Sequence, residues 1–336
     1  MLSRREFLKQ TGATGVVAAA SIQAACATKA AGAGVVQTVQ GPLAASKLGF
    51  TLTHEHICRC PLNIFGDRAN AVAKAIDRLK MAKDEGVDTV VDVTTFDIER
   101  DIRFGEEVSR KSGMQIVACT GQHLYAPDSF NERTVDEIAE FFIREIERGI
   151  EDTDIKAGVI KVASRSDTMT PAEEKVFKAA ARASKATGAP IETHTHARRR
   201  GGNAQAEIFE AEGVSAARVS LGHSDDTDDP AYLIALARRG YTLGMDHTFR
   251  GLAQGEKVPW QSRAQYIKQL IDAGFVDRMF LSNDWTFGDV ERDALNPDGM
   301  LFNTRKTIPY LKQIGVSHRE IRAITVDNPA RFFGRS

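Results

Sequence analysis

The segment Leu48-Gly-Phe-Thr-Leu-Thr-His54-Glu-His56 alternates apolar with small or polar residues and ends with two histidines two positions apart. This alternation predicts a strand, on which residues two apart point to the same face. Two imidazoles on one face at the end of a strand form a suitable pair of ligands for a transition metal ion. The segment therefore predicts a metal site where the first strand ends.

Seven more short β-branched runs follow, separated by longer amphipathic stretches. The expected strands are residues 48–53, 89–94, 115–120, 158–163, 190–195, 219–223, 242–246 and 279–284. The expected helices are residues 71–85, 135–148, 171–187, 204–212, 230–239, 265–273, 301–313 and 322–333. This alternation predicts an α/β fold, a parallel (β/α)8 TIM barrel. A doubly wound open sheet is disfavoured because no glycine-rich phosphate loop follows the first strand.

The barrel is expected to be a single domain spanning residues 35–336, with a short N-terminal β-hairpin at residues 35–43. Apolar residues make up 42% and charged residues 26% of the 336 residues, which is typical of a soluble globular enzyme. The net charge is −1 and the basic residues are spread along the chain. We therefore expect a small-molecule substrate and no nucleic-acid partner.

The N-terminus has a different composition from the rest of the chain. A twin arginine, Arg4-Arg5, precedes a run of small apolar residues at 12–20 and the sequence Ala24-Ala25-Cys26. This order predicts a twin-arginine export signal at residues 1–26 and a periplasmic protein. Cys26 also matches a lipoprotein cleavage site, which would attach the protein to the membrane. The remaining alternative is a disordered basic tail.

Further candidate ligands lie at the ends of later strands: Lys161 in the fourth, His194 in the fifth, His223 in the sixth and Asp284 in the eighth. In a TIM barrel, these strand ends open at one mouth. Four imidazoles and a carboxylate suit Zn²⁺, with Co²⁺ or Mn²⁺ as alternatives, and are too many for one tetrahedral ion. Two metal ions roughly 3.5–4 Å apart are therefore expected. The pattern alone leaves Lys161 open as a structural or an active-site lysine.

The chain resembles, over nearly its whole length, the bacterial phosphotriesterases (organophosphate hydrolases) of the amidohydrolase superfamily. The matching segments include Thr-His54-Glu-His56-Ile, Gly-Val-Ile-Lys161-Val, Thr-His194-Thr, Gly-His223-Ser-Asp225-Asp226, Gly-Met-Asp246-His247 and Ser-Asn-Asp284-Trp285. The resemblance implies that His54, His56 and Asp284 hold the more buried metal ion. His194 and His223 would hold the more exposed one, and a CO₂-derived carbamate on Lys161 would bridge the two together with hydroxide.

The same resemblance implies an activity and a proton path. The bridging hydroxide would attack the phosphorus of an organophosphate triester, and Asp284 would accept the proton and pass it through His247 to Asp226. The alternative for His247 and Asp226 is a surface hydrogen-bonded pair. Family members are commonly homodimers, so a homodimer is expected here.

The substrate pocket is where the resemblance weakens. Its expected residues are Arg59, Ile98, His123, Leu124, Trp285, Thr286 and Phe287. The segments after the seventh and eighth strands are shorter than in the insecticide-hydrolysing members, and shorter loops at a barrel mouth change substrate choice. A phosphotriesterase-like lactonase, which opens acyl-homoserine or other lactones, is therefore the alternative function. A non-catalytic exported metal- or ligand-binding protein is the remaining one.

Overall fold

The computed structural model describes residues 34–124, 130 and 132–335. The predicted export signal and Cys26 lie outside these residues. Within the described part of the chain, no helix has the length and apolar character needed to cross a membrane.

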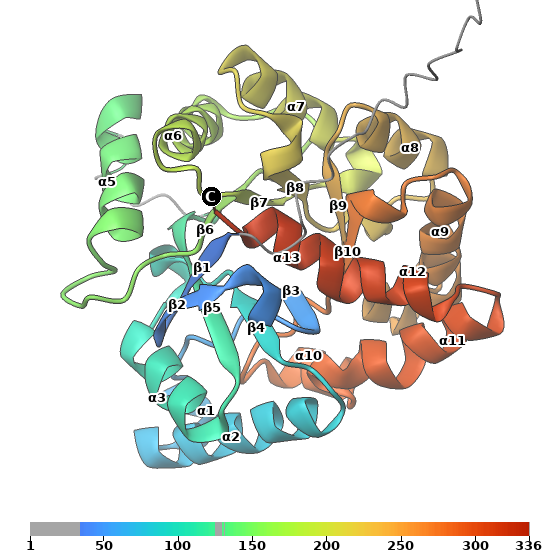
Figure 1. The fold of residues 1–336 in the computed structure, drawn as a ribbon, viewed down its shortest axis with the longest axis horizontal. Helices are drawn as coiled ribbons and strands as arrows, with labels where there is room; N and C mark the ends of the chain where they lie inside the picture. Colours follow the sequence, from blue (N-terminus) through green and yellow to red (C-terminus); the bar gives the residue numbers. More distant parts are fainter. Residues whose placement is uncertain (1–33, 125–129, 131, 336) are drawn as a thin grey trace, which may run out of the picture. The chain divides into compact units, whose positions relative to one another are not determined.

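Eight parallel strands form the centre of the fold, and helices surround them (Figure 1). The strands are β3 (Thr51–Glu55), β4 (Thr89–Asp92), β5 (Gln115–Gln122), β6 (Val159–Ala163), β7 (Ile191–His194), β8 (Val219–Leu221), β9 (Thr242–Met245) and β10 (Met279–Leu281). Each strand pairs with the next one along the chain. All eight coincide with predicted strands, so the predicted (β/α)8 TIM barrel is confirmed.

The barrel closes between its last and first strands through backbone bonds just beyond β10. The Asp284 N–H donates to the carbonyl of His54 at 2.9 Å, and a parallel bridge joins His56 to Thr286. The buried carboxylate of Glu55 accepts from the backbone N–H of Trp285 at 2.7 Å. Glu55, between the two histidines of the motif, therefore helps to fix the closing segment against them.

The pairing register between β3 and β4 shifts between Leu52 and Glu55. Leu52 packs in the core between strands and helices, whereas His54, two residues later, contacts Lys161 inside the barrel. A local irregularity of this kind re-aims a side chain. The alternation of side chains between the two faces of β3 is therefore interrupted between Leu52 and His54.

The helices have the following bounds: α1 (Leu62–Phe65), α2 (Arg68–Asp84), α3 (Ile102–Ser112), α5 (Val135–Glu147), α6 (Pro171–Thr187), α7 (Gly202–Ala211), α8 (Pro230–Arg238), α9 (Trp260–Asp272), α10 (Val290–Leu295), α11 (Ile308–Gln313), α12 (His318–Arg322) and α13 (Asn328–Phe333). Helix α6 starts and ends where the sequence predicts, because Thr170 and Glu173 form a capping box and Gly188 ends it in the left-handed region.

Three sequence expectations about helices need correction. The helix expected at residues 322–333 begins with a π-helical turn at Ala323–Asp327 and continues as α13. Helix α3 is absent from the expected set, although Asp101 caps its start and Gly113 ends it in the left-handed region. The single helix expected at residues 301–313 is instead a 3₁₀ turn, a π-helical turn at Asn303–Thr307 and then α11. Its interruption accompanies the side chain of Asn303, which is buried and donates to the carbonyl of Ser282.

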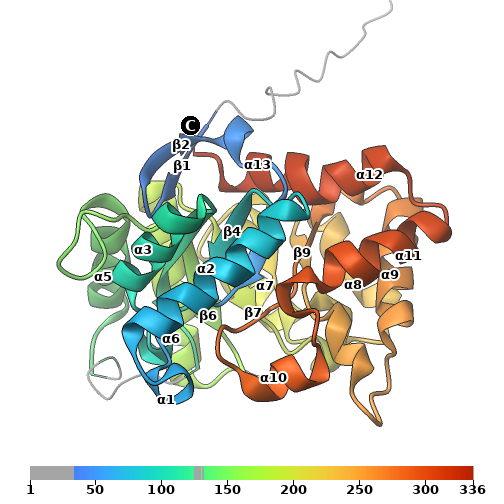
Figure 2. The same ribbon diagram turned by 90° about the horizontal axis from the view of Figure 1, so that it is seen from below.

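The predicted N-terminal hairpin is present as β1 (Val35–Thr38) and β2 (Gly41–Ala44), paired antiparallel. Val35 exchanges backbone bonds with Arg335, so the hairpin joins the C-terminal end of the described chain. Phe332 and Phe333 of α13 pack on Phe280 of β10 in the inner core. Figure 2 shows β1, β2 and α13 at one end of the barrel and α1 and α10 at the other. The hairpin and α13 thus cover the end opposite the strand C-termini.

Candidate metal centre

The residues predicted to bind metal lie together at the C-terminal ends of the barrel strands. Although these side chains come from five different strand regions, the strands converge at one mouth and bring them within contact distance. Most of them are buried, and the least buried is half-buried His194. The six are His54 and His56 at the end of β3, Lys161 in β6, His194 at the end of β7, His223 after β8 and Asp284 after β10.

Asp284 and the two histidines of the motif form one group. The Oδ1 atom of Asp284 lies 3.3 Å from Nε2 of His56 and 3.9 Å from Nε2 of His54. The Nζ of Lys161 lies 2.6 Å from the same Nε2 of His54. One carboxylate oxygen, two imidazole nitrogens and the lysine nitrogen therefore surround a common small volume.

His194 and His223 form a second group beside the first. Nδ1 of His194 lies 2.8 Å from Nε2 of His223. The ring centroids of His223 and His54 are 4.8 Å apart, so the two groups are contiguous. His223 has a φ of 56°, a left-handed backbone that is uncommon outside glycine. Its backbone N–H donates to Asp246 Oδ1 at 2.9 Å, which holds it in that conformation.

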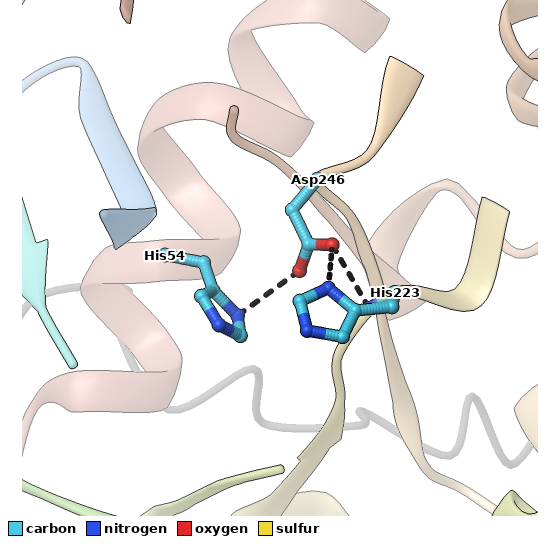
Figure 3. A group of neighbouring side chains, drawn as sticks. All are labelled: His54, His223 and Asp246. Carbon is cyan, nitrogen blue, oxygen red and sulfur yellow. Dashed lines mark hydrogen bonds and ion pairs between the residues drawn. The ribbon is translucent and has the colours of Figure 1, made fainter. Parts of the chain in front are cut away.

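Asp246, just after β9, contacts one histidine of each group, His54 and His223 (Figure 3). Its Oδ1 accepts from Nδ1 of His223 at 2.7 Å, and its Oδ2 lies 3.1 Å from Nδ1 of His54. Glu192 Oε1 lies 3.2 Å from the same His54 nitrogen. A carboxylate that accepts a hydrogen bond from the Nδ1–H of a histidine fixes the tautomer of that ring. The Nε2 atom is then left free to bind a metal ion.

Neither of these two carboxylates is among the site residues expected from the sequence. For Asp246 a signal was available, because it stands at a strand end directly before His247. Glu192 lies inside β7, where a fully buried acid in a barrel strand is the corresponding signal. Glu192 contacts the candidate ligands through His54, and Asp246 contacts both His54 and His223.

Burial lowers the pKa of His56, and it brings the pKa values of His194 and His223 well below the usual range. These three rings are therefore neutral. For His54, burial and the amine of Lys161 work against the charged form, but Asp246 and Glu192 raise the pKa to about 9. The carboxylates of Asp246 and Glu192, which favour protonation of His54, lie at its Nδ1 atom. Lys161 lies at the opposite ring nitrogen, Nε2.

The residues present fit divalent transition metal ions. Because Nδ1 of His223 donates to Asp246, its Nε2 presents a lone pair, and that lone pair faces a nitrogen of another neutral ring in His194. The Nε2 of His54 likewise faces the amine of Lys161. Imidazole nitrogens that converge beside a carboxylate can bind a divalent cation, and this donor set suits Zn²⁺, Co²⁺ or Mn²⁺.

The predicted relay residues form a continuous chain from Asp284. His247 Nε2 lies 2.8 Å from Asp284 Oδ2, and His247 Nδ1 lies 2.9 Å from Asp226 Oδ2. The guanidinium of Arg263, which is fully buried, donates to Asp226 Oδ1 at 2.5 Å. His247 is only 2% exposed and Asp226 is half-buried, so His247 does not lie on the surface. Although burial opposes a charged imidazole, Asp226 raises the pKa of His247.

Arg292, in α10, is a neighbour of the centre that the sequence did not indicate. Its Nη1 lies 2.8 Å from Asp284 Oδ2 and 3.1 Å from the hydroxyl of Thr286. Burial alone would raise the pKa of Asp284, but Arg292 and His247 bring it well below the usual range. Asp284 is therefore an anion in this site.

A cavity of ≈ 230 Å³ opens on the centre and contains four of the predicted pocket residues. Among the described residues that line it, Ile98 is the one aliphatic side chain, and the others are polar or charged. Burial lowers the pKa of His123 to about 3, so the ring in this cavity is neutral. The predicted pocket residues that line it are Arg59, Ile98, His123 and Thr286.

The other three predicted pocket residues do not line this cavity. Trp285 and Phe287 are buried, and Phe287 stacks on Phe65 with a centroid distance of 4.8 Å. The indole N–H of Trp285 donates to Asp293 at 2.8 Å. The rings of Trp285 and Phe287 pack in the core beneath the loop after β10 and do not face the cavity. Half-buried Leu124 supplies a backbone carbonyl that accepts from Arg165 at 2.6 Å.

Comparison with known proteins agrees with this geometry. The model of the phosphotriesterase family matches residues 34–333. A phosphotriesterase homology protein of Mycobacterium tuberculosis is 37% identical over 322 residues, covering 89% of this chain and 98% of that protein. An aryldialkylphosphatase of Saccharolobus solfataricus is 34% identical, covering 85% and 95%. An N-acetyltaurine hydrolase of Xenopus tropicalis is 26% identical, covering 89% and 97%. The chain belongs to the phosphotriesterase family.

Proposed function

We propose that the protein is a binuclear-metal hydrolase that cleaves organophosphate triesters. The observation that supports this best is the convergence of four imidazoles, one carboxylate and a buried amine at the barrel mouth, with Asp284 joined to the His247–Asp226 pair. Family membership supports a metal-dependent hydrolase. The choice of triesters rests on the resemblance of these residues to phosphotriesterases.

The ligands divide into two sets by their contacts. His54, His56 and Asp284 would hold the more buried ion, and His194 and His223 the more exposed one. The assignment is supported by the contact of Asp284 Oδ1 with His56 at 3.3 Å and by the separate contact of His194 with His223 at 2.8 Å. Two bound ions would polarise the phosphoryl oxygen and supply hydroxide at neutral pH.

Lys161 would bridge the two sets as a carbamate. A bare amine is a poor neighbour for metal ions, because when protonated it repels them. The Nζ is fully buried and bonds to an imidazole nitrogen of His54, and no carboxylate of the described residues lies within ion-pair distance of it. Addition of CO₂ to the neutral amine forms an N–C bond and releases one proton, which gives a two-oxygen anion of the right charge for two cations.

Asp284, His247 and Asp226 would move the proton released during attack. Asp284 Oδ2 accepts it, Nε2 of His247 takes it on, and Asp226 stabilises the resulting imidazolium through Nδ1. The burial of the two carboxylates is offset by charges at short range, since Arg263 contacts Asp226 and Arg292 contacts Asp284. Arg263 and Arg292 would thus keep both carboxylates ionised.

Lactone opening is the second candidate function. The described lining of the cavity beside Asp284 has one aliphatic side chain, Ile98, and is otherwise polar, which favours a compact polar substrate over a large aryl triester. The relatives named aryldialkylphosphatase and N-acetyltaurine hydrolase act, by those names, on different substrates. By their names, relatives of this chain therefore hydrolyse different kinds of bond, a phosphate ester and an amide.

The test is hydrolysis of paraoxon beside a panel of lactones by one zinc-loaded preparation. We expect a higher kcat/KM for paraoxon than for any lactone. A higher kcat/KM for a lactone than for paraoxon would favour lactone opening, the second candidate function, over triester cleavage. Failure to hydrolyse either class, with metal bound, would overturn both.

A further inference from the structure

A second cavity, of ≈ 210 Å³, adjoins the metal centre on the side of Asp226. Its chemically distinctive lining residues are His194, His196, Arg198, Asp226, Arg250 and Glu256. His194 also lines the first cavity, so the two cavities meet at the more exposed half of the centre. A substrate whose reacting group lies at the centre can therefore extend one part into each cavity.

Most charged side chains that line the second cavity form a close ion pair with another described residue, and Arg250 is the exception. Glu256 forms ion pairs with Arg198 and, at 3.7 Å, with Arg263. Arg263 also contacts Asp226 at 2.5 Å. Each acid that lines the cavity is thus already bound to at least one guanidinium. Among the cations of this described lining, Arg250 is the one left without a close acid.

Arg250 has one long ion pair, from Nη2 to Asp284 Oδ2 at 3.9 Å. That carboxylate oxygen already accepts from Arg292 at 2.8 Å and contacts His247 at 2.8 Å. The Nε of Arg250 is buried and has no hydrogen-bond partner among the described residues, and the same holds for Nδ1 of His196. A buried donor without an acceptor costs free energy, so a ligand that accepts hydrogen bonds would be favoured beside Arg250.

Arg59, the arginine of the first cavity, also has a buried Nε without a hydrogen-bond partner among the described residues. Its guanidinium forms an ion pair with Glu99 at 3.1 Å, whereas the one ion pair of Arg250 is 3.9 Å long, so the charge of Arg59 is the better compensated of the two. The Arg250 side chain is 40% exposed and accessible from the mouth, whereas its backbone bonds lie within the 3₁₀ turn Thr248–Leu252. A guanidinium with these properties recognises a carboxylate, sulfonate or phosphate group, which its planar donors match.

We propose that the second cavity binds an anionic group of the substrate, remote from the bond that is hydrolysed, with Arg250 as the residue that recognises it. This specifies the substrate class of the proposed hydrolase and rests on that function. The reacting ester lies at the centre, and its non-reacting arm ends in a negative charge beside Arg250 and His196. Neutral substrates would lack this contact.

The test uses butane-1-sulfonate as the anionic probe and 1-butanol as its neutral counterpart. Binding to the zinc-loaded protein is measured by isothermal titration calorimetry for the wild type, Arg250→Gln and Arg199→Gln. Arg199 is the matched control because it is exposed, lies on the neighbouring turn and does not line the cavity. The expected result is sulfonate binding to the wild type that is weakened at least about tenfold in Arg250→Gln and unchanged in Arg199→Gln.

Equal sulfonate affinity in the wild type and Arg250→Gln would overturn the proposal, because the anion would then bind elsewhere, for example to the metal ions. Equal binding of the sulfonate and the alcohol by the wild type, or no sulfonate binding at all, would overturn it as well. Arg250→Met, measured in the same way, replaces Arg250→Gln if the latter loses its cooperative thermal melt. These binding results are independent of turnover, so failure of paraoxon and lactone hydrolysis would be recognised separately.

Discussion

Asp246 accepts two hydrogen bonds from His223, one from the backbone N–H at 2.9 Å and one from Nδ1 at 2.7 Å. The first holds His223 in its left-handed backbone conformation, and the second fixes which ring nitrogen bears the proton. The other oxygen of Asp246 lies 3.1 Å from Nδ1 of His54. One carboxylate therefore orients a histidine in each half of the metal centre.

Replacing this carboxylate should weaken metal binding in both halves. In Asp246→Asn, the side chain keeps one acceptor oxygen, so an amide N–H would face the Nδ1 of either His54 or His223. One of the two rings would then lose its acceptor on Asp246. We expect zinc affinity to fall by about 10- to 100-fold in competition with a chromophoric chelator. Asp228→Asn, at an exposed position in the segment after β8, is the control and should keep the wild-type affinity. An unchanged affinity in Asp246→Asn would remove Asp246 from the support of the centre.

Lys161→Ala should lose metal and most activity, because the group proposed to bridge the two ions is removed. Added acetate or propionate should restore part of both, since a free carboxylate can occupy the vacated volume. Metal content and turnover are measured with and without the acid, and exposed Lys80→Ala is the control. Full activity in Lys161→Ala without added acid would exclude the carbamate bridge.

Asp284→Asn should slow turnover while leaving substrate binding nearly intact. The amide cannot accept the proton that His247 is positioned to receive, and proton transfer of this kind contributes about 10²- to 10⁴-fold to the rate. We expect kcat to fall within that range with little change in KM, for protein whose zinc content has been measured. A wild-type kcat would show that the proton takes another path.

Arg100, away from the centre, should make a large contribution to the free energy of unfolding. Its guanidinium is 1% exposed, lies 2.7 Å and 3.1 Å from the two carboxylate oxygens of Glu145, and donates to the carbonyl of Cys119 at 2.8 Å. Arg100→Met leaves the Glu145 carboxylate buried without its partner, which costs about 3–5 kcal/mol.

The measurement is urea denaturation monitored by circular dichroism, with Arg110→Met as the control. Arg110 is 63% exposed and forms a 4.0 Å pair with Glu106, so its loss should cost no more than about 1 kcal/mol. Similar unfolding free energies for the two variants would show that the Arg100–Glu145 pair is not stabilising.

The architecture of the barrel was predictable because each strand is a short β-branched run between turn residues, and this pattern can be read directly from the sequence. Helix α6 was predicted to the residue because Thr170, Glu173 and Gly188 specify both of its ends locally. The interruption before α11 was not, because it depends on Asn303 meeting the segment after β10, far away in the sequence.

The candidate site also contains some residues that the sequence predicts and others that depend on contacts formed only in the folded chain. The convergence of the candidate ligands His54, His56, His194, His223 and Asp284 was predictable because a parallel barrel brings strand ends to one mouth. The role expected of Lys161 came from the resemblance, because the pattern left it open. Asp246, Arg250 and Arg292 were not recognised, because their roles depend on which carboxylates and rings lie within about 4 Å after the loops have folded. Trp285 and Phe287 were placed in the pocket by resemblance, but their rings turn into the core beneath it.

These side chains are proposed to hold two metal ions. The zinc content per chain, measured by inductively coupled plasma mass spectrometry on zinc-saturated protein after removal of free metal, tests this proposal. We predict about two zinc ions per chain, as a binuclear hydrolase requires. A ratio of one or less at saturation would contradict the proposal.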